Sequence, residues 1–198
     1  KVVLRAVVND VELEKVTNSI LPDLNDINTP WIKIIENADD LRSAAVQMRR
    51  KSFGSALNAV PEDARLSEYE DALDRHYFTN ALKALTGKGP DVRFLKDLVA
   101  SEIDHRNILN VLEAKAVGLS NEQIVDLLLP GGKILPKRAF SAIATGGKDA
   151  MLDMLRNAPR FDGAAFEEAL ATSNETRSLD AVVTWLKERE HKKMARMS

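Results

Sequence analysis

Hydrophobic positions recur at helical spacing along most of the chain, and runs with the strict alternation of a β-strand are nearly absent. The clearest segment is 90–117, which is predicted to form one long helix with a single buried stripe. Pro90 suits the first turn of that helix, where its missing N–H costs nothing, and Gly118 supplies the left-handed residue that ends it. The apolar residues of the stripe are Phe94, Leu95, Leu98, Val99, Ile103, Leu109, Leu112 and Ala116.

Caps and helix breakers delimit the remaining predicted helices. Ser120 and Gln123 have the S-x-x-Q spacing of a capping box, and Pro-Gly-Gly at 130–132 ends the helix that they begin. Ser67 and Glu70 have the same kind of spacing and predict a helix that ends near residue 86. The sequence therefore predicts an all-α fold. The other helices are expected at 40–52, 54–59, 136–144, 148–157, 163–172 and 178–197.

The chain also repeats part of itself. Residues 3–22 (VLRAVVNDVELEKVTNSILP) align without a gap with residues 111–130 (VLEAKAVGLSNEQIVDLLLP). Six of the twenty pairs are identical, where average composition supplies about one. The pattern predicts tandem copies of a pseudo-symmetric helical-bundle domain of about 110 residues, much longer than a tetratricopeptide or HEAT repeat. The identical pairs are Val3/Val111, Leu4/Leu112, Ala6/Ala114, Glu14/Glu122, Leu21/Leu129 and Pro22/Pro130.

The repeat predicts two domains, at 1–86 and at 90–198. Most shared positions are ones that a helical bundle buries or uses to end a helix, as a duplicated core requires. The first copy lacks the counterpart of 90–108, and the chain begins without a methionine and ends in helical character. Both ends are therefore interpreted as truncated.

Composition narrows the class of protein. Hydrophobic residues make up 44% of the chain and charged residues 29%, as in an ordinary globular protein. The net charge of −2 argues against a nucleic-acid partner, which usually requires a strongly basic surface. The absence of cysteine excludes disulfides, thiolate catalysis and zinc–thiolate sites, and it favours a reducing, cytosolic environment. No apolar run approaches the roughly 20 residues of a transmembrane helix.

Segment 102–132, EIDHRNILNVLEAKAVGLSNEQIVDLLLPGG, carries a family likeness. It fits E-x-D-x-x-N followed by L-x-x-K-x-x-G-L-S-x-x-x-I-x-x-L-L-x-P-G-G, and it resembles the C subunit of archaeal A-type ATP synthases, which is similar to the d subunit of V-type ATPases. The stretch ALDRHYF at 72–78 resembles the same family. The motif residues singled out as structural or interaction residues are Glu102, Asp104, Asn107, Lys115, Gly118, Pro130, Gly131 and Gly132.

The resemblance implies a fragment that covers about two of three tandem helical domains. It implies a non-catalytic rotor part that lies between the central stalk and the membrane ring of proteolipid subunits, peripheral to the membrane on its cytoplasmic side, and transmits torque. It implies no cofactor and no small-molecule substrate. In the first copy the motif decays, because Asp10 stands where Gly118 does, Val7 where Lys115 does, and Asp23-Leu24 where the glycine pair does.

The residues themselves leave several interpretations open. Glu102, Asp104, Arg106 and Asn107 suit a solvated, salt-bridged helix face, buried polar bonds within the domain, or direct contact with the stalk or ring. Asn107 and Lys115 are expected to serve domain architecture, so alanine at either should lower the melting temperature.

Known chemical motifs are missing from the sequence. The Gly-Lys pairs at 87–88, 132–133 and 147–148 lack the other residues of a phosphate-binding loop and are interpreted as helix-ending turns. No two of His76, His105 and His191 have the spacing of helical metal ligands, so no metal site is expected. The alternatives to a stalk subunit are an unrelated α-helical adaptor with duplicated domains and a helical enzyme with an unrecognised site.

Overall fold

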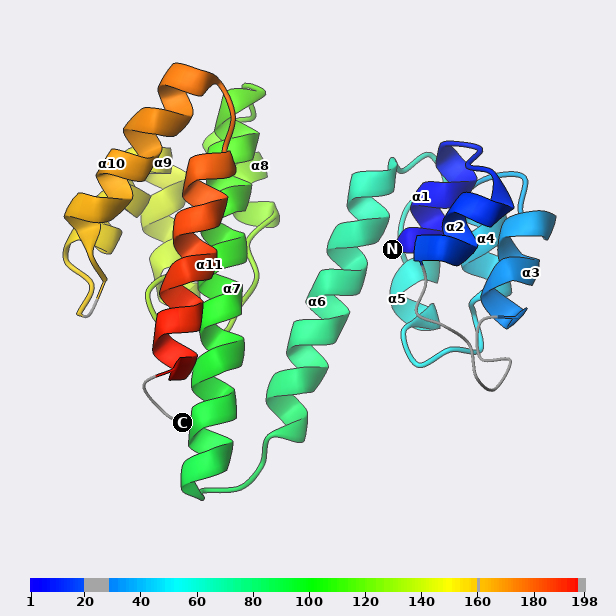
Figure 1. Cartoon of the computed structure of the whole chain (residues 1–198), viewed down its shortest axis with the longest axis horizontal. Helices are drawn as coiled ribbons and strands as arrows, with labels where there is room; N and C mark the ends of the chain where they lie inside the picture. The colour runs from blue at the N-terminus through cyan, green and yellow to red at the C-terminus, as the bar shows by residue number, and fades with distance from the viewer. Residues whose placement is uncertain (20–28, 160, 196–198) are drawn as a thin grey trace. The chain divides into compact units, whose positions relative to one another are not determined.

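The computed structural model describes residues 1–19, 29–159 and 161–195. Every regular element within these ranges is helical, so the all-α prediction is confirmed for them. Contacts divide the chain into two units, Lys1–Asn80 and Ala81–Ser198 (Figure 1). Each unit has its own hydrophobic core.

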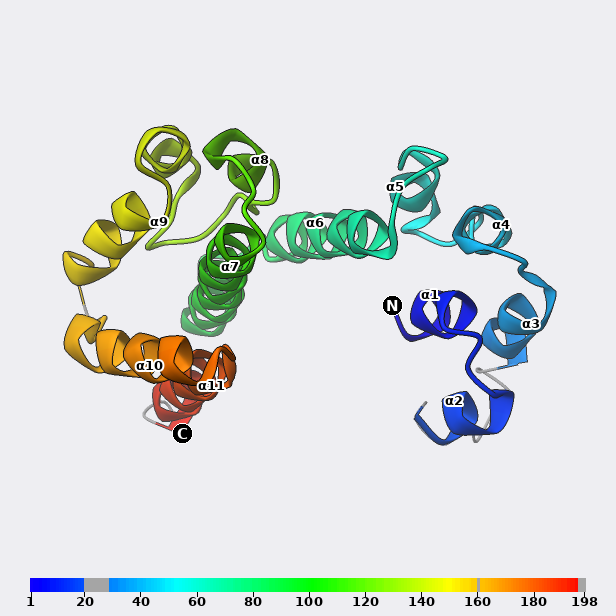
Figure 2. The ribbon, with the colours of Figure 1, turned by 90° about the horizontal axis from the view of Figure 1, so that it is seen from above.

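The first unit is built from short helices. They are α1 (Val2–Val8), α2 (Leu13–Ser19), α3 (Thr29–Asn37), α4 (Leu41–Gln47) and α5 (Gly54–Asn58), and α6 (Leu66–Ala84) begins in this unit. Side chains from α1, α3, α4, α5 and α6 meet in the core, and Leu4, Ala44, Leu57 and Tyr69 are each at most 1% exposed. Figure 2 shows α1 to α5 grouped around this centre. Helices this short are marginal alone, so their stability comes from the shared core.

The predicted capping box at Ser67 and Glu70 is wrong. Helix α6 begins at Leu66, and the carboxylate of Glu68 accepts a hydrogen bond from the backbone N–H of Arg65 at 2.9 Å. Glu70 instead pairs with Arg5 of α1, whose Nη2 donates to Oε2 at 2.8 Å. Ser67 is already the second residue of the helix, so it cannot cap the start of the helix. The side chain that reaches back to the start is that of Glu68, which binds the N–H group of Arg65.

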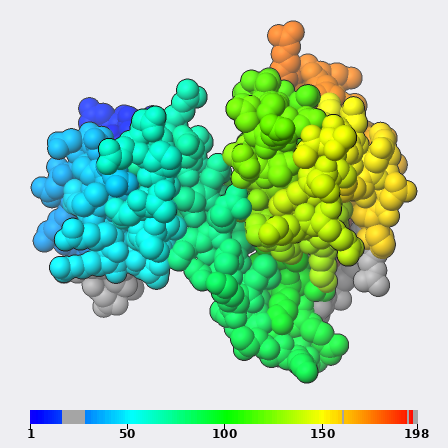
Figure 3. All heavy atoms as spheres, turned by 180° about the vertical axis from the view of Figure 1, so that it is seen from behind, coloured from blue at the N-terminus to red at the C-terminus, as the bar shows by residue number. Residues whose placement is uncertain are grey.

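The second unit contains the long helices. They are α7 (Pro90–Ala116), α8 (Asn121–Asp126), the short 3₁₀ helix η1 (Lys137–Ala139), α9 (Phe140–Arg156), α10 (Gly163–Thr176) and α11 (Asp180–Ala195). Helix α11 packs on both α7 and α10, and Figures 1 and 2 show it beside each of them. Figure 3 shows α8 and α9, coloured green to yellow, side by side on one face of this unit.

The capping box at Ser120 and Gln123 is confirmed, with the Gln123 N–H donating to Ser120 Oγ and the Ser120 N–H to Gln123 Oε1. The helices predicted at 136–144 and 148–157 are the two limbs of α9. Gly147 interrupts the helical backbone between them with φ 56° and ψ −134°. A Cβ at this glycine would meet the amide of Asn121, so α8 packs tightly against the kink.

The predicted stripe on α7 needs correction. Of its eight residues only Ile103 and Leu112 are buried, while Leu95 is 43% exposed and Ala116 is also exposed. The buried face of the helix instead includes the polar side chains of Asp104 and Asn107. The apolar core of this unit starts at Ile108, which explains why the apolar positions nearer the start of the helix are only partly covered.

The two repeated segments end their first helices in the same way. Helix α1 ends at Val8 and α7 ends at Ala116, and the second residue after each, Asp10 and Gly118, has left-handed backbone with φ 46° and 80°. The following N–H then donates back to the helix in both cases: Val11 to Ala6 at 3.1 Å and Leu119 to Ala114 at 2.9 Å. The repeated positions Ile20, Leu21 and Pro22, and their neighbours Asp23 and Leu24, lie outside the described residues.

Exchanging the residue types at these two helix ends is expected to change stability in opposite directions. Gly118→Ala should lower the free energy of unfolding by about 1 kcal/mol, because a Cβ there meets no neighbour and only the left-handed backbone is penalised. Asp10→Gly should raise it by about 0.5 kcal/mol, because glycine adopts this backbone freely and a negative charge leaves the negative end of α1. Urea unfolding followed by circular dichroism measures both changes.

Asp10→Asn is the control, because it removes the charge and keeps a side chain with some tolerance for left-handed backbone. If Gly118→Ala were neutral and Asp10→Gly destabilising, the left-handed geometry at these helix ends would be wrong.

Candidate functional site

The first half of the family motif lies on one face of α7 and binds the backbone of the segment that follows α8. The side chain of Asn107 is fully buried. Its Nδ2 donates to the carbonyl of Leu129 at 2.9 Å, and its Oδ1 accepts from the N–H of the same residue at 2.7 Å. One turn further along, Asn110 Nδ2 donates to the carbonyl of Leu127 at 2.9 Å. These two amides satisfy a stretch of backbone that neither a helix nor a sheet satisfies.

Asp104 completes this row with a carboxylate that is 2% exposed. It accepts hydrogen bonds from the N–H groups of Lys133, Ile134 and Leu135 at 2.9, 3.0 and 2.9 Å. Burial raises the pKa of Asp104 above its ordinary value, while the three backbone donors act in the opposite direction by stabilising the charged form. The carboxylate therefore fixes the turn that follows the Pro-Gly-Gly break.

The glycine pair allows this close approach. A Cβ on Gly132 would overlap Oδ1 of Asp104. Gly131 has φ 115°, and a Cβ there would lie 2.5 Å from Cδ1 of Leu82. Pro130 is exposed at the start of the turn. The second half of the motif thus gives the backbone the room and the conformation that the first half needs.

The structure brings together Asp104, Asn107, Gly131 and Gly132, and it places the other motif residues elsewhere. Lys115 is exposed in the last turn of α7, where its positive charge favours the negative end of the helix dipole. Gly118 ends that helix. For Asp104 and Asn107, the geometry corresponds to the interpretation of buried polar bonds within the domain.

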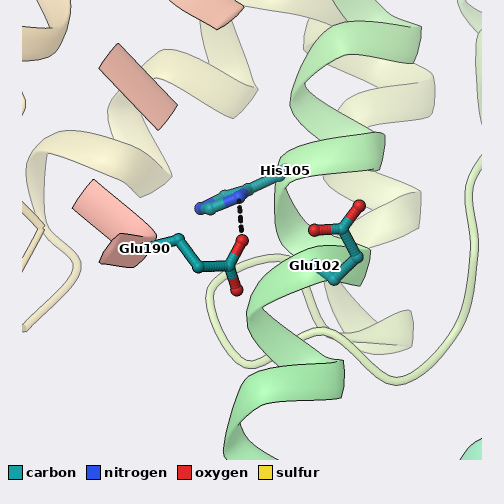
Figure 4. A group of neighbouring side chains, drawn as sticks. All are labelled: Glu102, His105 and Glu190. Carbon is teal, nitrogen blue, oxygen red and sulfur yellow. Dashed lines mark ion pairs between the residues drawn. The ribbon is translucent and has the colours of Figure 1, made fainter. Parts of the chain in front are cut away.

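Glu102 belongs to a second cluster, which joins α7 to α11 (Figure 4). His105 is 6% exposed, and its Nδ1 lies 3.5 Å from Oε2 of Glu190. Arg189 Nη1 lies 3.3 Å from the other ring nitrogen, Nε2. Burial raises the pKa of Glu102, and the negative charge of Glu190 raises it further. These side chains come from the facing sides of two packed helices.

Sequence reasoning found Glu102 and missed Glu190 and Arg189, which lie far away along the chain. A signal was present in the last helix. Val182 and Leu186 are buried four positions apart, and the same stripe continues into Arg189 and Glu190. Charged residues at the end of a buried stripe indicate polar partners on the facing helix.

Neither cluster lines the groove of this unit. The groove has a volume of about 480 Å³ and lies between α10 and α11. Small residues and Trp185 form its lining together with the carboxylates of Glu168, Asp180 and Glu188. Asp104 and Asn107 lie outside this groove and bind backbone groups of their own unit.

A comparison with known protein families shows which family the chain belongs to. The sequence profile of the ATP synthase (C/AC39) subunit family matches residues 1–198. The chain belongs to this family. The unrelated adaptor considered from the sequence is thereby excluded.

Similar proteins in three archaea are each named as the C subunit of an A-type ATP synthase. The protein of Pyrococcus horikoshii is 30% identical over 71% of this chain, and that of Methanococcoides burtonii is 23% identical over 67%. The protein of Thermococcus onnurineus is 40% identical over 35% of the chain. The chain covers 37%, 37% and 19% of these three relatives, so it spans less than two fifths of each.

No solved structure matches the chain significantly. Among the helices that the structure describes, none combines the length and the apolar character that crossing a bilayer requires.

Truncating the buried amide should affect stability far more than truncating the exposed lysine of the same motif. Asn107→Ala leaves the backbone N–H and C=O of Leu129 buried without a partner, which is expected to cost about 2–4 kcal/mol. Lys115→Ala removes only a favourable interaction with the helix dipole and should cost less than about 1 kcal/mol. Thermal and urea unfolding of the two variants measure the difference.

The reverse ranking, with Lys115→Ala the more damaging substitution, would contradict the structural role of Asn107. Asn107→Asp is a further check. It keeps the acceptor for the Leu129 N–H but loses the donor for the carbonyl, so its stability should lie below that of the natural protein.

Proposed function

We propose that this chain is part of a non-catalytic central-stalk subunit of an A/V-type rotary ATPase. In this role it couples the rotor shaft to the membrane ring of proteolipid subunits and transmits torque. The observation that carries the proposal is the family match over residues 1–198, together with relatives named as the C subunit of A-type ATP synthases.

The internal construction of the second unit supports a mechanical role. Helix α7 has 27 residues and is about 40 Å long. Its side chains bind the 127–135 segment through hydrogen bonds to backbone groups and face α11 through the Glu102 cluster. A coupling element must keep its shape under load, because bending would consume the rotation that it should transmit. Buried bonds to fixed backbone groups oppose such bending.

The proposed partners are the central-stalk subunits and the proteolipid ring, with no nucleic acid and no small-molecule substrate. The protein would associate with the membrane peripherally, on its cytoplasmic side, through the complex. Within the motif, Asp104 and Asn107 direct their polar atoms to backbone partners, as structural residues would.

Reconstitution of the rotary complex with and without the full-length protein tests the proposal. Without it, the soluble catalytic head should still hydrolyse ATP, while ATP-driven ion pumping across the membrane should be lost. Adding the full-length protein back should restore pumping. Pumping is measured with an ion-gradient dye in vesicles, and hydrolysis is measured by phosphate release in the same samples.

The same assay has a matched pair of variants. Lys115→Ala should restore pumping like the natural protein, and Asn107→Ala should restore it less well because the second unit is weakened. Complexes that pump at full rate without this protein, or hydrolysis that stops when it is removed, would refute the proposed coupling role.

A further inference from the structure

We propose that Glu102, His105 and Glu190 form a binding site for a divalent transition-metal ion of the zinc class, which ties α11 to α7. The three side chains converge from two helices (Figure 4). One ligand atom from each lies within 4.8 Å of the others. The inference concerns this chain alone and does not depend on the proposed function.

One separation between donor atoms, that of His105 and Glu190, fits a shared ion, and Glu102 would move closer on binding. His105 Nδ1 and Glu190 Oε2 are 3.5 Å apart. Two ligands at 2.0–2.2 Å from one tetrahedral zinc ion lie about 3.4 Å from each other. Charge-assisted hydrogen bonds are shorter, at about 2.7–2.9 Å. The observed separation is therefore closer to that of two ligands of one metal than to that of a tight ion pair.

The electrostatics also favour a cation between the helices. Glu102 and Glu190 are two partly buried carboxylates that approach within 4.8 Å, and like charges at this distance repel strongly. A cation between them removes the repulsion and binds both. Helix α7 supplies Glu102 and His105 from positions three apart, which place both side chains on one face of the helix.

The donor set selects the class of metal. One imidazole nitrogen and two carboxylate oxygens are the ligands of zinc and its first-row neighbours, whereas magnesium and calcium prefer oxygen alone. Three protein ligands leave a fourth tetrahedral position for water. Helix–helix fastening requires only the three protein bonds.

Two arginines act against the ion. The positive charge of Arg106 acts on Glu102, and Arg189 Nη1 lies 3.3 Å from His105 Nε2. A guanidinium only donates, so Arg189 favours the tautomer with the lone pair on Nε2 and the proton on Nδ1. A metal on Nδ1 requires the opposite tautomer. Arg189 and the ion therefore compete for His105. If the ion binds, the Arg189 guanidinium loses its contact with His105 but can retain its contact with the Phe161 ring, whose centroid lies 5.0 Å away.

Titration of the full 198-residue chain with Zn²⁺ tests the site by isothermal calorimetry. One ion should bind per chain, and the melting temperature should rise with the metal concentration. Mg²⁺ should give neither effect. Glu190→Gln, Glu102→Gln and His105→Gln should each lower the affinity about a hundredfold or more. Co²⁺ should give the visible spectrum of a low-coordinate nitrogen and oxygen site.

Arg189→Gln distinguishes a metal site from a merely structural cluster. It removes the competing donor and a positive charge, so Zn²⁺ should bind more tightly, by about tenfold. This variant keeps all three ligands, and circular dichroism is used to check that it folds. A structural role alone predicts no gain in affinity.

His76→Gln and His191→Gln are matched controls, since both histidines lie outside the cluster and should leave the affinity unchanged. The proposal is overturned if the natural chain shows no saturable Zn²⁺ binding, if either control lowers the affinity as much as His105→Gln, or if Arg189→Gln binds Zn²⁺ no more tightly than the natural chain.

Discussion

A non-helical segment that crosses a helix inside an all-α unit must find partners for its backbone groups. Helix α7 cannot offer its own backbone, because that is already bonded within the helix, so polar side chains must do so. Asp104, Asn107 and Asn110 stand at intervals of three along the helix and bind successive parts of the segment 127–135. The E-x-D-x-x-N spacing and the glycine pair depend on each other, because the Asp104 carboxylate comes this close only with Gly132 opposite it, and Gly131 fits against the side chains of Leu82 and Ile103.

Burying a carboxylate in this way costs free energy, and its three hydrogen bonds to backbone N–H groups offset that cost. The main effect of the arrangement is to fix the position of segment 127–135 along α7. A shift of the segment by one residue would leave the Asp104 carboxylate without its donors and the Asn107 amide without its matched pair. An apolar contact at the same place would tolerate such a slip, since the hydrophobic effect is non-directional and does not distinguish neighbouring registers. The motif therefore specifies where the chain lies more than it adds to overall stability.

The helices were predictable because their spacing and caps are local. The Ser120 capping box was found for this reason, and the one at Ser67 was wrong because the neighbouring Glu68 already binds the N–H group of Arg65. Burial of Asp104 and Asn107 was not predictable from sequence, since the same residues also suit a solvated face. Predicting the Glu102 cluster would have required knowing which face of α11 packs against α7, and this is determined only by tertiary packing.

Asp104 and Glu102 are two residues apart on α7, which places them roughly 200° apart around the helix axis. The first binds the segment 127–135 and the second faces Glu190 of α11. A helix fastened on one side can still tilt about that side. Fastened on opposite sides, it can tilt only if one set of contacts breaks. With a cation at the proposed site, the two clusters together would give α7 a resistance to bending that neither provides alone, and the proposed coupling role requires such resistance.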